Sequence, residues 1–351
     1  MIQEENEAQS PDELRVLKYQ ALGNSYLILD PRDNQQSARY GIERADGYIV
    51  PSTEVVTWLC DQSRGIGSNG LLFGPVKMAG SKNFGLCIIN SDGTYAGFSG
   101  NGIRIFAKYL LDAGYVRQGA CFGVQTLLDG IVDIPRVATV NIGAKEPWLI
   151  DVTLPYPPRF GPAAIGANAG SISPITDDDG GLSFTVNALT ELGKRLTGAE
   201  HAWKSSTFVD VGNPHCSTFV QEPSFLPSRQ QLLSCDDVLR AISFRHSGIN
   251  VAPTFAHGAN LQWVSVLNRS AINVVIYERG EGPTDASGSS ACAAACAAFA
   301  RGMVGPIVEV NMPGGSLIVR IVAEAKKIAS VTLSGTAIRI LEARVDGSAR
   351  E

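Results

Sequence analysis

Two similar stretches decide the fold of this chain: "YAGFSGNGIRIFAKYL", residues 95–110, and "TDASGSSACAAACAAFARG", residues 284–302. In each, a serine (Ser99 or Ser287) stands directly before a glycine and a run with helical character. Serine is a favoured residue just before a helix, because its hydroxyl accepts a hydrogen bond from a free N–H group in the first turn. The pattern predicts two helices that begin at corresponding points.

The two halves of the chain repeat one another around these helices. Ser99 and Ser287 are 188 positions apart, as are Gly114 and Gly302, where the helical patterns end. Further landmarks at offsets of 189 and 191 are Gly23-Asn24 with Gly212-Asn213, and Asn69 with Asn260. An ordered set of landmarks with nearly constant offsets predicts a duplicated α/β unit, in which two domains face each other across a cleft.

Alternation of apolar and polar residues predicts the strands of both halves. Strands are expected within residues 14–30, 70–76, 84–90, 123–134, 148–157, 205–220, 260–267, 271–280, 315–322 and 328–341, and short helices within 53–61 and 229–242. Residues 157–181 are rich in Gly, Pro, Ser and Asp and predict a surface or interdomain loop. We expect a disordered leader at 1–13, an N-terminal domain at 14–150 to which a strand near 338–351 returns, and a C-terminal domain at 151–337.

Composition narrows the classes of function. The net charge is −5 and no Lys/Arg run is present, so a nucleic-acid partner is not expected and a small-molecule substrate is favoured. Seven cysteines without a CxxC pair suit neither a disulfide framework nor a structural zinc site, and they favour a reducing compartment. The acidic N-terminus lacks the features of a signal peptide, and no apolar run is long enough to cross a membrane. The sequence therefore predicts a cytoplasmic protein without a membrane or metal partner.

Paired helix N-termini have a chemical use. Unpaired N–H groups and the positive end of the helix dipole bind anions, so two such termini can hold one carboxylate between them. Ser99 and Ser287 would then lie on opposite faces of the carbon next to that carboxylate. Two proton-carrying groups in those places would invert a stereocentre. The alternative is that both serines are helix caps and nothing more, worth about 1 kcal/mol each.

Five motifs, in this order, resemble the diaminopimelate epimerase family: "KYQALGNSYLILD", "NSDGTYAGFSGNGIR", "GNPH", "GANLQWV" and "YERGEGPTDASGSSACA". The resemblance runs from about residue 14 to residue 341. It implies a cofactor-independent amino-acid epimerase of two pseudo-symmetric α/β domains, each a mostly antiparallel sheet around a central helix, with the active site between them. It places Ser99 and Ser287 at the catalytic positions. The substrate-binding residues that it implies are Asn24, Asn90, Gly100, Asn101, Asn213, Asn260, Glu278, Arg279, Gly288 and Ser289.

Several of these residues also have an ordinary structural interpretation. An asparagine in a Gly-rich turn, such as Asn24 or Asn69, is often a left-handed turn residue. Adjacent charges such as Glu278 and Arg279 are usually a surface ion pair. His215 in "GNPH" is interpreted as structural, and Cys292 as a core residue.

The departures from the family concern its two catalytic cysteines, which are serines here. An alcohol is less acidic than a thiol by roughly 7 pKa units, so an alkoxide base would cost ~10 kcal/mol more than a thiolate. Ser289, Ser290 and Pro283 also depart from the family pattern, which favours natural divergence over engineered substitutions. We expect an isomerase that inverts the α-carbon of diaminopimelate or another polar amino acid. The alternative is a silent amino-acid-binding homologue, and whether the chain forms a homodimer is left open.

Overall fold

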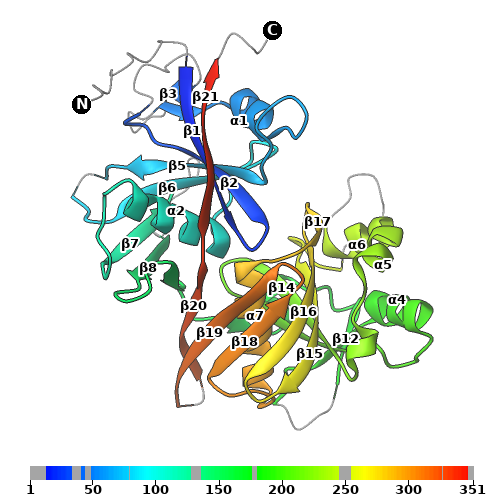
Figure 1. Cartoon of the computed structure of the whole chain (residues 1–351). Coiled ribbons are helices and arrows are strands. Elements are labelled where there is room, and N and C mark those ends of the chain that lie inside the picture. Colours follow the sequence, from blue (N-terminus) through cyan, green and yellow to red (C-terminus); the bar gives the residue numbers. More distant parts are fainter. Residues whose placement is uncertain are drawn as a thin grey trace, which may run out of the picture.

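The protein is an α/β molecule in which nearly all strands belong to one large, mostly antiparallel sheet (Figure 1). This computed structural model describes residues 13–33, 41–43, 49–78, 80–127, 136–175, 180–244, 254–325 and 327–346. The expected leader falls outside these ranges except for Glu13, which begins the first strand.

The first half contains seven consecutive neighbouring strands. They are β1 (Glu13–Ala21), β2 (Asn24–Leu29), β5 (Gly70–Val76), β6 (Phe84–Asn90), β7 (Cys121–Thr126), β8 (Arg136–Ile142) and β9 (Leu149–Thr153). Their pairings run antiparallel, parallel, antiparallel, parallel, antiparallel and antiparallel. The sharp turn between β1 and β2 uses positive φ angles at Leu22 and Gly23.

The second half repeats this arrangement strand for strand. Its members are β13 (Ser205–Asp210), β14 (Pro214–Val220), β15 (Asn260–Asn268), β16 (Ala271–Glu278), β18 (Ile307–Met312), β19 (Gly315–Glu324) and β20 (Lys327–Thr336). The order of parallel and antiparallel pairings is the same as in the first half. The predicted fold class, two pseudo-symmetric α/β units, is confirmed.

Two further strand contacts join the halves. β20 pairs with β9, and β21 (Ile338–Asp346) pairs with β1, so the end of the chain lies along the first half. In Figure 1, β20 and β21 form one long ribbon that runs from the lower part of the molecule to the upper part. The expected domain boundary at residue 150 falls inside β9, and the division into two domains stays a prediction.

Each half is built around one long helix. α2 (Gly100–Asp112) and α7 (Gly288–Ala300) both have 13 residues, and Ser99 and Ser287 precede them with nearly identical extended backbone angles. α7 is rich in alanine, the best helix former, whose small side chain also allows close packing on every side. Residues 288–298 are accordingly all buried. α2 is buried on almost every side too.

The remaining elements lie around this core. They are α1 (Thr53–Cys60), α3 (Pro162–Ile165), α4 (Asn187–Thr197), α5 (Arg229–Ser234), α6 (Asp236–Ser243), a 3-10 turn at Pro223–Phe225, β3 (Gly41–Glu43), β4 (Ile49–Pro51), β10 (Arg159–Phe160), β11 (Ile172–Pro174), β12 (Phe184–Val186) and β17 (Gly282–Thr284). The segment 157–181, expected to be a loop, contains β10, α3 and β11. These elements are too short to produce a periodic pattern. α4 was not expected from the sequence.

One hydrophobic cluster spans both halves, because side chains of α2 and α7 belong to it together with residues of the surrounding strands. Two smaller clusters lie between α4, α6 and the second half, and between α1 and the first half. The central helices therefore hold fixed positions within the packed core. No helix of the described ranges has the length and apolar character needed to cross a bilayer.

Candidate active site

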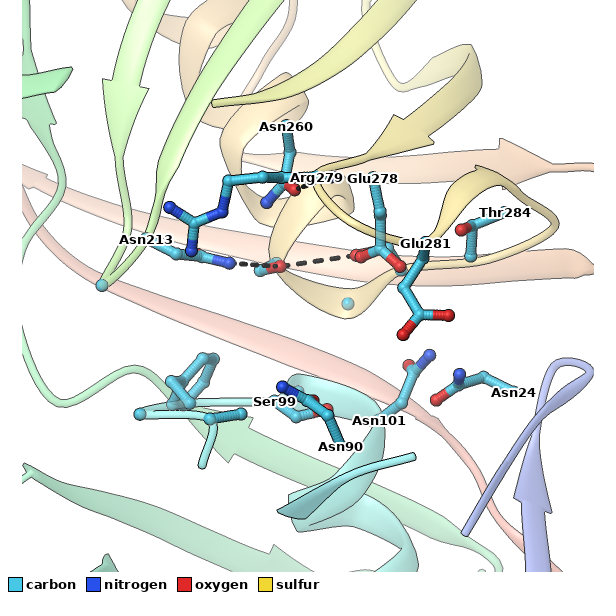
Figure 2. Close-up of a pocket in the computed structure, with 18 of the residues that line it drawn as sticks. Asn24, Asn90, Ser99, Asn101, Asn213, Asn260, Glu278, Arg279, Glu281 and Thr284 are labelled. Carbon is cyan, nitrogen blue, oxygen red and sulfur yellow. Dashed lines mark hydrogen bonds between the residues drawn. The ribbon is translucent and has the colours of Figure 1, made fainter. Parts of the chain in front are cut away.

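A pocket of about 440 Å³ lies where the two halves meet, and all twelve residues predicted for the site line it. Its volume is in the range of small-molecule sites. Residues of the first half and of the second half face each other across it (Figure 2). The predicted residues are Asn24, Asn90, Ser99, Gly100, Asn101, Asn213, Asn260, Glu278, Arg279, Ser287, Gly288 and Ser289.

The N-termini of α2 and α7 touch each other at the floor of this pocket. A Cβ atom at Gly288 would lie 3.1 Å from the Cα of Gly100, and one at Gly100 would lie 3.3 Å from the Cα of Gly288. Only glycine permits so close an approach of two backbones. The Asn101 side chain adds a bond across the contact, since its Nδ2 donates to the carbonyl of Ala286 at 3.3 Å. Both positive helix ends therefore point into one site.

Ser99 has two hydrogen-bond contacts. Its Oγ accepts from the backbone N–H of Gly102 at 3.0 Å, so the serine is a helix cap. The same Oγ lies 3.3 Å from the phenol oxygen of Tyr26 on β2. Capping and a place in the pocket are thus compatible, and the capping interpretation does not exclude a chemical one.

Ser287 caps α7 in the same way but has a different neighbour. Its Oγ accepts from the backbone N–H of Ser290 at 3.4 Å and lies 3.4 Å from Ser289 Oγ. Ser289 in turn receives a hydrogen bond from Asn213 Nδ2 at 3.4 Å. The Ser287 hydroxyl also donates to the carboxylate of Glu278. A series of hydrogen-bonded side chains therefore runs from Asn213 through the two serines to the carboxylate of Glu278.

Glu278 and Arg279 do not form the surface ion pair that adjacent charges suggest. Among the described residues, no ion pair links them, and Arg279 instead donates to the carbonyl of His257. Removal from water raises the pKa of Glu278 above its ordinary value, with a further rise from the charge of Glu281. The pKa of Glu281 is raised for the same reason. The pocket therefore contains carboxyl groups that accept protons more readily than exposed ones.

The asparagines are not left-handed turn residues. Leu22 and Ala325 are the non-glycine residues with positive φ in the described part of the chain. Asn69 accepts from the N–H of Ser25 at 3.0 Å, and Asn260 accepts from the N–H of Arg279 at 2.9 Å. These amides fix the pocket walls and add donors and acceptors without net charge. In all, the pocket has six asparagines: Asn24, Asn69, Asn90, Asn101, Asn213 and Asn260.

Six polar residues of the pocket were not among the predicted site residues: Tyr26, Asn69, Tyr95, Arg136, Glu281 and Thr284. Tyr26 could have been found, because it is two positions after Asn24 on one strand and alternate residues share a face. Glu281 and Thr284 follow Glu278 in the short β16–β17 hairpin. The guanidinium of Arg136 lies against Gly97. No sequence motif marks Arg136 as a site residue, since only tertiary folding brings β8 to the site.

His215 and Cys292 have structural surroundings, as expected. His215 is fully buried on β14, where its ring nitrogens contact Gln262 Oε1 at 3.1 Å and Asn213 Oδ1 at 2.9 Å. Burial lowers the pKa of His215 to about 4, so the ring stays neutral and orients Asn213. Cys292 is buried inside α7, where burial raises the pKa of its thiol to about 12. None of the seven cysteines forms a disulfide.

The fold defines a structural class that includes proteins described as a probable proline racemase, a hydroxyproline epimerase and a methylitaconate isomerase. Solved structures with the same fold include a phenazine biosynthesis protein of the PhzF family from Bacillus anthracis (TM-score 0.58, 12% identity, 95% of this chain and 99% of that one). A probable proline racemase from Agrobacterium radiobacter has a TM-score of 0.56 at 14% identity and covers 96% of this chain and 95% of its own.

Sequence comparison places the chain within this class. Diaminopimelate epimerase 2 of a Nostoc strain is 31% identical over 314 residues, which is 88% of each chain. A diaminopimelate epimerase of a Synechococcus strain is 30% identical over 310 residues, 88% of this chain and 91% of its own. The family profile described as Diaminopimelate epimerase matches residues 207–340. The chain belongs to the diaminopimelate epimerase family.

Proposed function

We propose that the chain is a cofactor-independent epimerase or racemase that inverts the α-carbon of an amino acid by proton transfer on two faces. One observation supports this most strongly: two helix N-termini meet at one pocket, and each carries a serine at its head. The helix ends bind the α-carboxylate of the substrate and stabilise the negative charge that develops when the α-proton leaves.

The base on the Ser287 face is a pair of groups, in which Ser287 passes a proton to Glu278. As the α-proton moves to Ser287 Oγ, the proton of Ser287 moves to the Glu278 carboxylate, with which it already shares a hydrogen bond. No alkoxide accumulates, because Glu278 takes up the proton of Ser287 while Ser287 Oγ takes up the α-proton. The negative charge that the incoming proton neutralises is therefore that of the Glu278 carboxylate. The cost of forming a serine base, which is high for an isolated alcohol, then depends on the pKa of Glu278.

The substrate is an α-amino acid with a second polar or charged end, such as diaminopimelate. Two guanidinium groups, Arg136 from the first half and Arg279 from the second, line the pocket. Neither has a carboxylate partner among the described residues, so either can bind an acidic group of a ligand. The asparagine amides and Glu281 offer partners for ammonium groups.

Proton exchange at the α-carbon tests this proposal. The purified protein is incubated in D2O with LL- or meso-diaminopimelate, with glutamate and lysine as comparison substrates, and followed by proton NMR and chiral chromatography. We expect loss of the α-proton signal together with formation of the other stereoisomer. Saturable binding of diaminopimelate without exchange or inversion would overturn the proposal and would identify a silent binding protein.

A further inference from the structure

The phenol oxygen of Tyr26 lies within hydrogen-bond distance of the Ser99 hydroxyl. The two oxygens are 3.3 Å apart, and Tyr26 is buried, with 7% of its surface exposed, while it still lines the pocket. The ring is fixed by the neighbouring strand, because a Cβ atom at Gly70 would lie 2.8 Å from Tyr26 Cε1. A glycine at that position therefore makes the space in which the ring lies.

The hydrogen bonds around Ser99 leave its own proton free. A hydroxyl has one donor and two acceptor sites, and the Ser99 Oγ already accepts from the N–H of Gly102. The phenol is the stronger acid of the Tyr26–Ser99 pair, so it donates and Ser99 accepts. Both lone pairs of Ser99 are then occupied, and its O–H is available to the pocket.

The arrangement at Ser287 has the opposite polarity. There the serine proton is donated to Glu278, so no proton is offered to a ligand, and a lone pair of Ser287 Oγ becomes available when the long 3.4 Å contact with Ser289 Oγ is given up. Ser287 thus contacts a carboxylate, which accepts protons, and Ser99 contacts a phenol, which supplies them. The two faces of the pocket are chemically different although the backbone is pseudo-symmetric.

The local charges favour the neutral phenol. Mainly through burial, the pKa of Tyr26 is raised to about 12: the hydrogen bond with Ser99 lowers it, and the nearby carboxylates of Glu278 and Glu281 contribute to the rise. Tyr26 is therefore protonated at neutral pH, yet it remains a better acid than water, whose pKa is about 15.7. A phenol in this state can deliver a proton to a carbanion and recover one from solvent.

We infer that Tyr26 supplies the proton that Ser99 delivers to the second face of the α-carbon, an assignment that rests on the proposed function. The Cα–H bond breaks on the Ser287 face, its electron pair stays on carbon, and its proton ends on Glu278. A new C–H bond forms with the proton of Ser99 as the proton of Tyr26 moves to Ser99 Oγ. The Glu278 acid and the Tyr26 phenolate then return to their starting forms by exchange with water.

The substitution Tyr26→Phe removes the phenol oxygen and keeps the ring that packs on Gly70. With LL-diaminopimelate in D2O, the inversion rate is expected to fall at least about 100-fold, the scale of general acid catalysis. Exchange of the α-proton with retention of configuration is expected to continue, because Ser287 and Glu278 still remove and return a proton on one face. A loss of structure alone would reduce both rates together.

The matched control is Tyr19→Phe. It removes the phenol oxygen of another buried tyrosine of the first half. This oxygen donates a hydrogen bond of 3.1 Å to Asp112 and does not line the pocket. The ratio of exchange to inversion should stay at the wild-type value in this variant. If Tyr26→Phe does not fold, Ser99→Ala interrupts the same relay and is expected to give the same excess of exchange over inversion.

The outcomes separate the two proposals. A wild-type protein that exchanges and inverts, together with a Tyr26→Phe variant that inverts at the wild-type rate, overturns the assignment of Tyr26 alone. A ratio of exchange to inversion that is unchanged in Ser99→Ala does the same. A wild-type protein that binds diaminopimelate but shows neither reaction overturns the proposed function and the assignment with it.

Discussion

At the scale of single residues, the two serines differ in the titratable side chain that each contacts. Ser287 donates to Glu278, whereas Ser99 lies against Tyr26. Serine is a weak acid and a weak base when it stands alone, and it becomes useful when a second group gives or takes the proton. Under the proposed function, the two contacts give one alcohol a proton acceptor and the other a proton donor.

Glu278 can be tested by removing its charge. The substitution Glu278→Gln keeps the size of the side chain and its contact with Ser287 but removes the proton acceptor. We expect α-proton exchange in D2O to fall about 100-fold or more, with the melting temperature unchanged or higher, because a carboxylate shielded from water costs stability. The control Glu281→Gln, in the same pocket, should lose less than tenfold. Equal losses in both variants would contradict the assignment.

The pH dependence of the rate follows from the same group. Glu278 must be ionised to accept a proton, and its pKa is raised above the ordinary 4.5 by its removal from water. The acid side of the profile of kcat/KM should therefore show a decline at a pH above 4.5, as the carboxylate becomes protonated. In Glu278→Gln this decline should be absent from the residual activity. A profile that is flat down to pH 4.5 in the wild-type protein would count against Glu278.

Thiols in place of the two serines should make the site faster. In Ser99→Cys combined with Ser287→Cys, the side chains are more acidic by roughly 7 pKa units, so each can carry the proton itself. We expect diaminopimelate epimerisation, measured by chiral chromatography, to rise at least tenfold over the wild-type protein. A fall in rate with unchanged diaminopimelate binding would show that the pocket is built around the serine relays.

At the scale of elements, the contact between the N-termini of α2 and α7 positions the site. A Cβ atom at Gly288 would lie 2.8 Å from Leu333 Cδ2 and 3.1 Å from Gly100 Cα. Gly288→Ala must therefore displace one helix end, and we expect a loss of about 1–3 kcal/mol in the free energy of unfolding together with weaker diaminopimelate binding.

Chemical denaturation and calorimetry measure both effects of Gly288→Ala. The control is Gly305→Ala, because a Cβ atom there would meet its nearest neighbour, the carbonyl of Arg269, at an ordinary 3.4 Å. If Gly288→Ala were as stable as the wild-type protein and bound diaminopimelate equally well, the helix contact would not determine the geometry of the site.

Arg104 supports this contact from inside α2. Its side chain is fully buried, its Nη2 donates to Asn101 Oδ1 at 2.7 Å, and its Nε and Nη1 have no hydrogen-bond partner among the described residues. Burial lowers the pKa of Arg104 to about 10. The guanidinium thus orients Asn101, which in turn bonds across to Ala286.

Arg104→Met should separate stability from function. Loss of an incompletely paired buried charge is expected to leave the melting temperature unchanged or raise it, while KM for diaminopimelate rises about tenfold because Asn101 is no longer held. Lys108→Met, on the same helix, removes a cation that pairs with Asp112 and should leave KM unchanged. A lower melting temperature with normal KM would assign Arg104 a purely structural part.

The sequence predicts the elements of the site better than its side-chain contacts. The spacing of 188 residues places both helices at their true starts, because a serine before a glycine marks the first turn so clearly. It does not show that Glu278 reaches Ser287 or that Tyr26 reaches Ser99, since strand–helix packing decides those distances. Arg136 is the extreme case, a pocket residue with no motif around it.

At the scale of the whole molecule, the duplicated halves are joined by the last strands of the chain. β20 pairs with β9, and β21 pairs with β1. A chain that ends after Ala337 loses β21 and leaves the edge of β1 unpaired, so we expect lower stability and aggregation in size-exclusion chromatography. A chain that ends after Asp346 keeps β21 and should behave as the full protein. Equal behaviour of both truncated chains would show that β21 adds no stability.

In the proposed reaction, one proton leaves and another arrives on opposite faces of the same carbon. The most direct measurement is the isotope content of substrate and product during the first few per cent of conversion of LL-diaminopimelate in D2O by the wild-type protein. We predict that the inverted product carries deuterium at the α-carbon while the remaining substrate still carries protium. An inverted product that retains protium, or deuterium that enters both pools at equal speed, would contradict proton transfer on two faces.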